Sequence, residues 1–101
     1  MGKVMRYLLA GHEPEDRIRD LLLLTDIRSE DLQDALVSHY SKGFPAKSVC
    51  VAYSIAPPNF SRGDARLNEV AGIVERIKER DWARFNYRLT DNLAITNDKK
   101  D

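Results

Sequence analysis

Gly43–Leu67, GFPAKSVCVAYSIAPPNFSRGDARL, is the stretch that decides the fold, because it predicts a short helix, a tight turn and a second helix. Pro45 suits the first position of a helix, since its φ is already helical and its missing N–H would have had no partner there. Pro57 and Pro58 end the first helix and open the second. The first helix would bury one stripe, formed by Val49, Cys50 and Tyr53.

The second helix has an apolar side and a polar side. Its apolar positions recur at helical spacing and predict burial of Phe60, Leu67, Val70, Val74 and Ile77. The opposite side carries Asn59, Ser61, Arg62 and Arg66. Two helices around an apolar plug at Ile55, the second presenting amide, hydroxyl and guanidinium groups outward, are typical of a helix-turn-helix that contacts DNA. A hairpin of two helices in an ordinary bundle would show the same apolar pattern, so pattern alone leaves both interpretations open.

Two further helices are predicted upstream. The first runs from about Pro14 to Leu24 and begins with acidic residues, which the positive end of the helix dipole favours. The second has Ser29 as its N-cap and Gly43 at its end. Its spacing predicts one buried face, formed by Leu32, Ala35, Leu36, His39 and Tyr40. The chain is therefore expected to be all-α, a small bundle of four to five helices containing the helix-turn-helix.

One domain is expected for a chain of 101 residues. Its predicted parts are an N-terminal arm at 1–13, a helical DNA-binding domain at 14–90 with the helix-turn-helix at 45–67, and a flexible C-terminal tail at 91–101. Beyond Leu67 the pattern fits either a helix continuous to Glu79 or a break near residues 67–68 followed by a further helix.

Charge is unevenly distributed along the chain. The formal net charge is zero, which argues against a protein that coats nucleic acid through bulk positive charge. Residues 1–46 hold six Lys and Arg against eight Asp and Glu, whereas residues 47–88 hold eight against five. The basic excess thus coincides with the second helix of the pair and its continuation, which favours a local basic face there.

Neither an enzyme nor a metal or cofactor site is indicated. The single cysteine excludes an intramolecular disulfide, and neither it nor His12 and His39 has partners at the spacing of a metal site. No Ser/His/Asp order and no glycine-rich phosphate loop is present in the sequence. A signal-peptide pattern and an apolar stretch of membrane length are also missing. We therefore expect a cytoplasmic protein with no membrane partner and no small-molecule substrate.

Several residues between Leu22 and Val70 stand at a recognisable spacing. They are Cys50, the Phe60–Ser61 pair and the Arg66–Leu67 pair. This half of the chain resembles the PapB family of bacterial fimbrial-operon regulators, in which a Cys, a Phe-Ser and an Arg-Leu recur at the same separations. The resemblance implies a small cytoplasmic transcription regulator, activating or repressing, that binds A/T-rich repeats in double-stranded DNA with minor-groove contact and oligomerises along them.

The resemblance also implies which residues contact DNA: Lys47, Cys50, Asn59, Ser61, Arg62 and Arg66. The two arginines are four residues apart and share one helix face, where they would neutralise phosphates or enter a narrow A/T-rich groove. The alternative is a solvated face on which an arginine pairs with an acid such as Asp64 or Glu69. For Cys50 a packing role as a small buried hydrophobe is favoured over a groove contact.

The chain departs from the family pattern at three places. Pro45–Ala46 stands where the family has Ser and Arg, which removes one cation. Pro57–Pro58 replaces a more ordinary turn, and Gly63–Asp64 introduces a carboxylate. Asp64 would face the same phosphates that the neighbouring arginines attract. The preferred operator is therefore expected to differ from that of the family.

Self-association is expected because a regulator that recognises short sites gains specificity by pairing them through a dimer or a row of protomers. The candidate residues lie in two apolar runs and comprise Leu21, Leu22, Leu24, Trp82 and Phe85. The alternative is that these side chains belong to the core of a single chain, which a small domain also needs.

The sequence therefore predicts a DNA-binding transcriptional regulator that controls a fimbrial or pilus operon by cooperative binding. Two other functions fit the same face. A small helical adaptor or anti-regulator would use it to bind a protein. A plasmid or phage repressor would insert it into the major groove of DNA.

Overall fold

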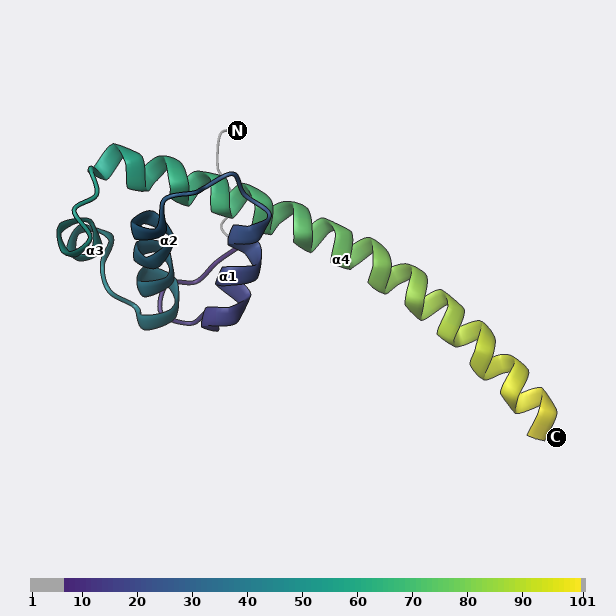
Figure 1. The fold of residues 1–101 in the computed structure, drawn as a ribbon. Helices are drawn as coiled ribbons and strands as arrows, with labels where there is room; N and C mark the ends of the chain where they lie inside the picture. The colour runs from purple at the N-terminus through teal and green to yellow at the C-terminus, as the bar shows by residue number, and fades with distance from the viewer. Residues whose placement is uncertain (1–6, 101) are drawn as a thin grey trace, which may run out of the picture.

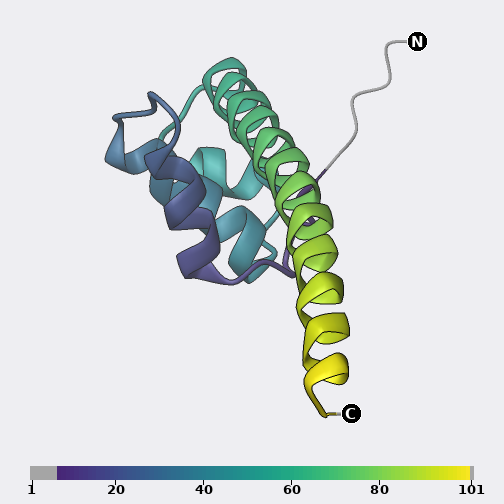
Figure 2. The same cartoon turned by 90° about the vertical axis from the view of Figure 1, so that its right-hand side faces the viewer.

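The computed structural model describes the backbone of residues 7–100 and the side chains of residues 7–84. Its elements are α1 (Glu15–Leu23), α2 (Glu30–Val37), the π-helix η1 (Ser38–Lys42), α3 (Ala46–Ala52) and α4 (Pro57–Lys100). The three shorter α-helices lie along the first part of α4, and the rest of α4 extends away from them (Figures 1 and 2). Residues 7–100 contain no strand, so the predicted all-α fold is confirmed.

The starts of α1 and α2 follow from local sequence. α1 begins after Pro14, with two acidic residues in its first turn. Ser29 caps α2 as predicted, because its side chain accepts a hydrogen bond from the Leu32 backbone N–H at 3.2 Å. The sequence predicts one helix from Ser29 to Gly43. In the structure α2 ends at Val37, η1 continues from Ser38, and Gly43 ends η1 with a φ of 82°.

Two glycines allow the N-terminal segment, residues 7–13, to lie directly on the end of η1. Gly11 and Gly43 both have positive φ, and a Cβ on Gly11 would stand 3.1 Å from the Gly43 Cα. A side chain at either position would be strained, since L-residues rarely adopt this φ and the two backbones touch. The Glu13 backbone N–H donates to the Tyr40 carbonyl oxygen at 3.0 Å, which fixes the segment there.

The core takes side chains from all four α-helices. One buried residue of each is Ile18, Leu36, Val49 and Leu67. Burying each such side chain contributes about 1.5–3 kcal/mol. The predicted burial of Phe60 and Val70 is confirmed, and Val74 packs against the edge of the core. Ile77 is 50% exposed, so its predicted burial is wrong: it lies beyond the turns of α4 that contribute to the core.

α4 passes through residues 67–68 without interruption, so the alternative of a break there is wrong. A Cβ at Gly63 would stand 2.9 Å from Cδ2 of Leu32, so this glycine lets α2 approach α4 although it disfavours the helix by about 1 kcal/mol. Pro45, predicted as the first helical residue, is instead the N-cap of α3. α4 also continues through residues 91–100, where the sequence favours a flexible tail. The boundaries of arm, domain and tail stay predictions.

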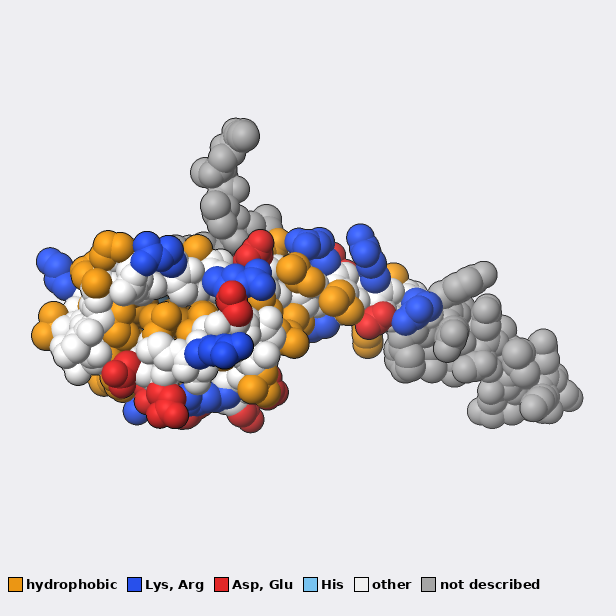
Figure 3. Space-filling view, turned by 45° about the horizontal axis from the view of Figure 1, so that its top comes forward, with side chains coloured by type: hydrophobic (Ala, Val, Ile, Leu, Met, Phe, Trp, Pro, Cys, Tyr) orange, Lys and Arg blue, Asp and Glu red, His pale blue; other side chains and the backbone are white. Residues whose placement is uncertain are grey.

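Figure 3 shows charged side chains of both signs on one face of the molecule, with Lys and Arg prominent along α4. Among the described residues, no group of three or more His, Cys, Asp or Glu side chains could hold a metal ion. None of the helices described combines the length and the apolar composition that a membrane span requires.

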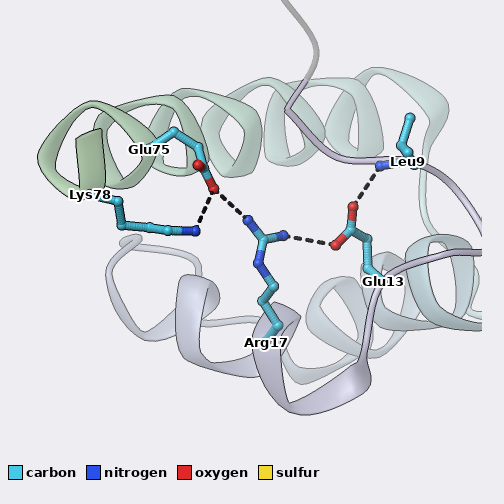
Figure 4. A network of polar contacts seen from close by, with 5 residues as sticks. All are labelled: Leu9, Glu13, Arg17, Glu75 and Lys78. Carbon is cyan, nitrogen blue, oxygen red and sulfur yellow. Dashed lines mark hydrogen bonds and ion pairs between the residues drawn. The ribbon is translucent and has the colours of Figure 1, made fainter. Parts of the chain in front are cut away.

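Arg17 of α1 joins the N-terminal segment to α4 (Figure 4). Its guanidinium donates to Glu13 Oε1 at 2.8 Å and to Glu75 Oε2 at 2.9 Å. Glu13 also accepts from the Leu9 backbone N–H, and Glu75 also accepts from Lys78 Nζ. This network therefore ties three parts of the chain, the N-terminal segment, α1 and the middle of α4, to one another.

We expect the network to make the fold less stable in acid. The hydrogen bond from Lys78, helped by the charges of Lys78 and Arg17, holds the pKa of Glu75 below its ordinary value. The unfolded chain then takes up the proton at a higher pH than the folded chain does. The stability that this carboxylate contributes is present above the ordinary pKa and is lost as pH falls through the lowered one.

The urea midpoint of the wild type should fall when the pH is lowered from about 7 to about 3, and the midpoint of Glu75→Gln should fall by less. Glu79→Gln, at an exposed position of the same helix, is the matched control. Equal acid sensitivity of the wild type and Glu75→Gln would contradict this assignment.

Candidate nucleic-acid interface

α3, the turn after it and the start of α4 form the helix-turn-helix arrangement. Residues 53–56 join the two helices. Ile55 is partly buried against the core, and its backbone N–H donates to the Cys50 carbonyl oxygen at 2.8 Å, which closes the turn around this plug. Ser54 has a positive φ of 56°, which lets the chain reverse. The first turn of α4 therefore lies at one end of the molecule, next to α3 (Figure 1).

The structure separates the six predicted DNA-contact residues into two groups. Asn59, Arg62 and Arg66 line a cavity of 520 Å³ between α4 and the residues around the start of α2. The second group, Lys47, Cys50 and Ser61, lines a groove of 340 Å³ between α3 and α4. All except Cys50 and the partly exposed Arg66 are exposed.

Asn59 and Arg62 are held together on the outer face of α4. The Arg62 guanidinium donates a hydrogen bond to Asn59 Oδ1, one turn earlier on the helix. Arg66 follows one turn later, so the three side chains share a face, as their spacing predicts. An amide and two guanidinium groups on one exposed face can contact phosphates and base edges.

Arg66 is paired with acidic side chains. Its guanidinium contacts Glu69 Oε1 at 2.6 Å and lies 3.7 Å from Asp26 Oδ1. The hydrogen bond to Glu69, with the charges of Glu69 and Asp26, raises the pKa of Arg66 above its ordinary value. The pairing with Glu69 that the sequence offers as an alternative to phosphate contact is therefore present. Because both acids are solvent-exposed, the pairs contribute little to stability.

Asp64 turns away from these arginines, so the expectation that it faces the phosphates is wrong. Its carboxylate accepts hydrogen bonds from the Tyr40 hydroxyl and from Asn68 Nδ2, the latter at 3.0 Å. Tyr40 and Asn68 are both buried. A buried hydroxyl requires an acceptor, and Asp64 supplies it across the contact between η1 and α4.

Cys50 is only 7% exposed and belongs to the core. The position of Cys50 therefore supports the packing role that the sequence favours. Cys50 also lines the groove between α3 and α4. A small side chain there lets the two helices of the pair approach each other.

Arg28 and Ser29 were not predicted as part of the site, yet they line the same cavity as Asn59 and Arg62. Arg28 belongs to the segment before α2, and Ser29 is the N-cap of that helix. No local pattern predicts that this segment lies beside α4, because the contact joins residues about thirty positions apart. Asp26 and Asp31 line the cavity too, so its charge is mixed.

The predicted self-association residues occupy different environments. Leu21 and Leu22 are each 4% exposed and belong to the core, so their side chains cannot meet a second chain in this conformation. Leu24 is 59% exposed and Trp82 is 62% exposed. Phe85 lies outside the residues whose side chains are described. The candidates that lie at the surface are thus Leu24, after α1, and Trp82, on the extended part of α4.

The fold is similar to that of a solved protein. The crystal structure of E. coli FocB matches this chain with a TM-score of 0.68 and 25% sequence identity, over 72% of this chain and 83% of FocB. Neither a protein-family model nor a curated protein sequence matches the chain. The likeness therefore rests on the arrangement of the helices, and it includes most of the FocB chain.

Proposed function

We propose that this chain is a DNA-binding transcriptional regulator of a fimbrial or pilus operon, acting in the cytoplasm on A/T-rich double-stranded DNA. The observation that carries the proposal is the outer face of α4, where Asn59, Arg62 and Arg66 lie together at the exposed end of the helix-turn-helix. FocB, a fimbrial-operon regulator of the PapB family, has a similar fold over most of its length. That likeness supports a regulatory role in preference to an enzymatic one.

The face would bind DNA mainly through phosphates. Arg62 and Arg66 each neutralise one phosphate and release its counterions, which makes the affinity depend steeply on salt. Arg66 exchanges its exposed carboxylate partner Glu69 for a phosphate when DNA binds. Asn59, oriented by Arg62, supplies a donor and an acceptor for a base edge. Cooperation between copies, through Leu24 and Trp82, would raise the affinity for repeated sites.

The test compares Arg62→Ala/Arg66→Ala with the wild type on a duplex carrying several A/T-rich repeats, over a series of salt concentrations. We expect roughly tenfold weaker binding and a salt slope that is lower by about 2, because two phosphate contacts are lost. Arg76→Ala/Arg80→Ala is the matched control. It removes the same charge at the same spacing on exposed positions of α4, about 21 Å along the helix from the first pair.

Three results would change the proposal. If the wild type binds the duplex no better than a scrambled G/C-rich one, a protein partner becomes the better explanation of this face. If the two double variants lose affinity equally, the contact is bulk charge and not this face. If methyl groups in the major groove block binding while a minor-groove ligand does not, the protein contacts the major groove, as a plasmid or phage repressor would.

A further inference from the structure

The first turn of α4 offers few backbone N–H groups to a phosphate. Pro57 and Pro58 lack the group altogether. The N–H groups of Asn59 and Phe60 both donate to the Ala56 carbonyl oxygen, at 2.9 and 3.1 Å. In an ordinary helix the first four N–H groups have no partner within the helix, and they make its N-terminus an anion-binding site. In α4 three of these four groups are missing or paired, those of Pro57, Pro58 and Asn59.

An apolar surface takes its place. Pro57 and Pro58 are both exposed at the tip of the helix. Pro57 lines the groove between α3 and α4 together with Ile55 and with Val51, which is 77% exposed. A proline side chain has no rotamer freedom to lose on contact, so the tip presents a rigid apolar edge.

One cation lies on each side of this apolar tip. Lys47 lines the groove on one side of the prolines, and Arg62 lies one turn along α4 on the other. None of the residues that line this groove is acidic, and Asp64 is hydrogen-bonded to Tyr40 and Asn68. Hydrophobic side chains lie between Lys and Arg side chains at the end of the molecule where α4 begins (Figure 3). An apolar edge flanked by cations fits the bases and phosphates of a duplex.

From these observations we infer that the protein bends DNA, with Pro57–Pro58 entering between two base pairs from the minor groove while Lys47 and Arg62 contact the phosphates on either side. The inference rests on the DNA binding proposed above and adds how the tip of α4 is used. Apolar wedges, proline among them, unstack a base step from the minor-groove side and kink the duplex by roughly 20–90°. The usual alternative, phosphate capture by helix N–H groups, is weakened by the same two prolines.

The bend is measured as energy transfer between dyes at the two ends of a short duplex with the A/T-rich site at its centre. The wild type should bring the ends closer together. Pro57→Ala/Pro58→Ala removes both rings and restores two N–H groups, and we expect it to leave the duplex straight. Pro14→Ala is the matched control, because it removes an exposed proline from the N-cap of α1, and it should bend DNA as the wild type does.

A second measurement tests the unstacking step itself. A mismatch at the centre of the site lowers the energy needed to open the stack, so the wild type should bind it roughly tenfold more tightly than the intact duplex. The double variant should lose this preference. Circular dichroism melting checks that each variant is folded. If the double variant is unfolded, the single variant Pro58→Ala is used in its place, because it keeps Pro57 at the first helical position.

The outcomes separate the two proposals. If the wild type binds no duplex, the proposed function fails and the bending inference fails with it. If the wild type binds but the duplex ends do not approach each other, the inference is wrong and the proposed function stands. The same holds if the proline variant bends DNA as strongly as the wild type.

Discussion

Leu67→Ala is expected to lower the free energy of unfolding by about 2–5 kcal/mol. Leu67 is fully buried on α4, and this helix packs against α1, α2 and α3. Removing its methyl groups takes away their transfer energy and leaves a cavity that the surrounding helices fill only in part. A small domain is stable by about 5–15 kcal/mol in total, so urea denaturation should show a large shift of the midpoint.

Ile77→Ala is the control for this prediction. It shortens an aliphatic side chain on the same helix, ten positions later, where the side chain is 50% exposed. We expect a change within about 0.5 kcal/mol. Similar losses for the two variants would contradict the position of Leu67 at the centre of the core.

Much of the fold could be predicted from local signals. Ser29 caps α2 because a hydroxyl before two acidic residues is what a helix start needs, and Pro57 opens α4 because its fixed φ is helical. The sequence left the continuity of α4 open between two alternatives, because Gly63 weakens the helix locally and its compensation is contact with Leu32 of α2. The contact of Gly11 with Gly43 depends on tertiary structure in the same way.

The part of the candidate site that could be predicted is the part whose exposure follows from helical spacing. Asn59 and Arg62 lie on the outer face of α4 because the opposite face carries the apolar stripe. Asp64 was misplaced although helical spacing already puts it on the other side of α4 from Arg62 and Arg66. Its partner there, Tyr40, lies 24 positions earlier in the sequence. Arg28 was missed because only the packing of residues before α2 on α4 brings it to the cavity.

Tyr40→Phe is expected to lower the free energy of unfolding by about 1–3 kcal/mol, although it removes only one oxygen atom. The Tyr40 side chain is buried, and its hydroxyl donates to Asp64 and accepts from Asn68 Nδ2 at 3.0 Å. Phenylalanine fills the same volume, so the loss comes from a carboxylate and a buried amide that each lose one hydrogen bond. Urea denaturation at neutral pH measures it.

A double-mutant cycle isolates this network from simple packing. Asn68→Ala removes the amide that bonds both Tyr40 and Asp64, so the effect of Tyr40→Phe should be smaller in that background. We expect a coupling of about 0.5–3 kcal/mol between the two substitutions. Additive effects would show that the Tyr40 hydroxyl and the Asn68 amide act independently, which contradicts the geometry.

The same network should also influence DNA binding. It holds Asp64 against η1, although this carboxylate lies between Arg62 and Arg66 in the sequence of α4. When Tyr40→Phe removes one of its donors, the negative charge of the carboxylate is less compensated on a helix whose two arginines would neutralise phosphates. We therefore expect Tyr40→Phe to weaken DNA binding at temperatures where it is fully folded, and Asp64→Asn in the same background to restore it. An affinity unchanged by Tyr40→Phe would mean that the network serves stability alone.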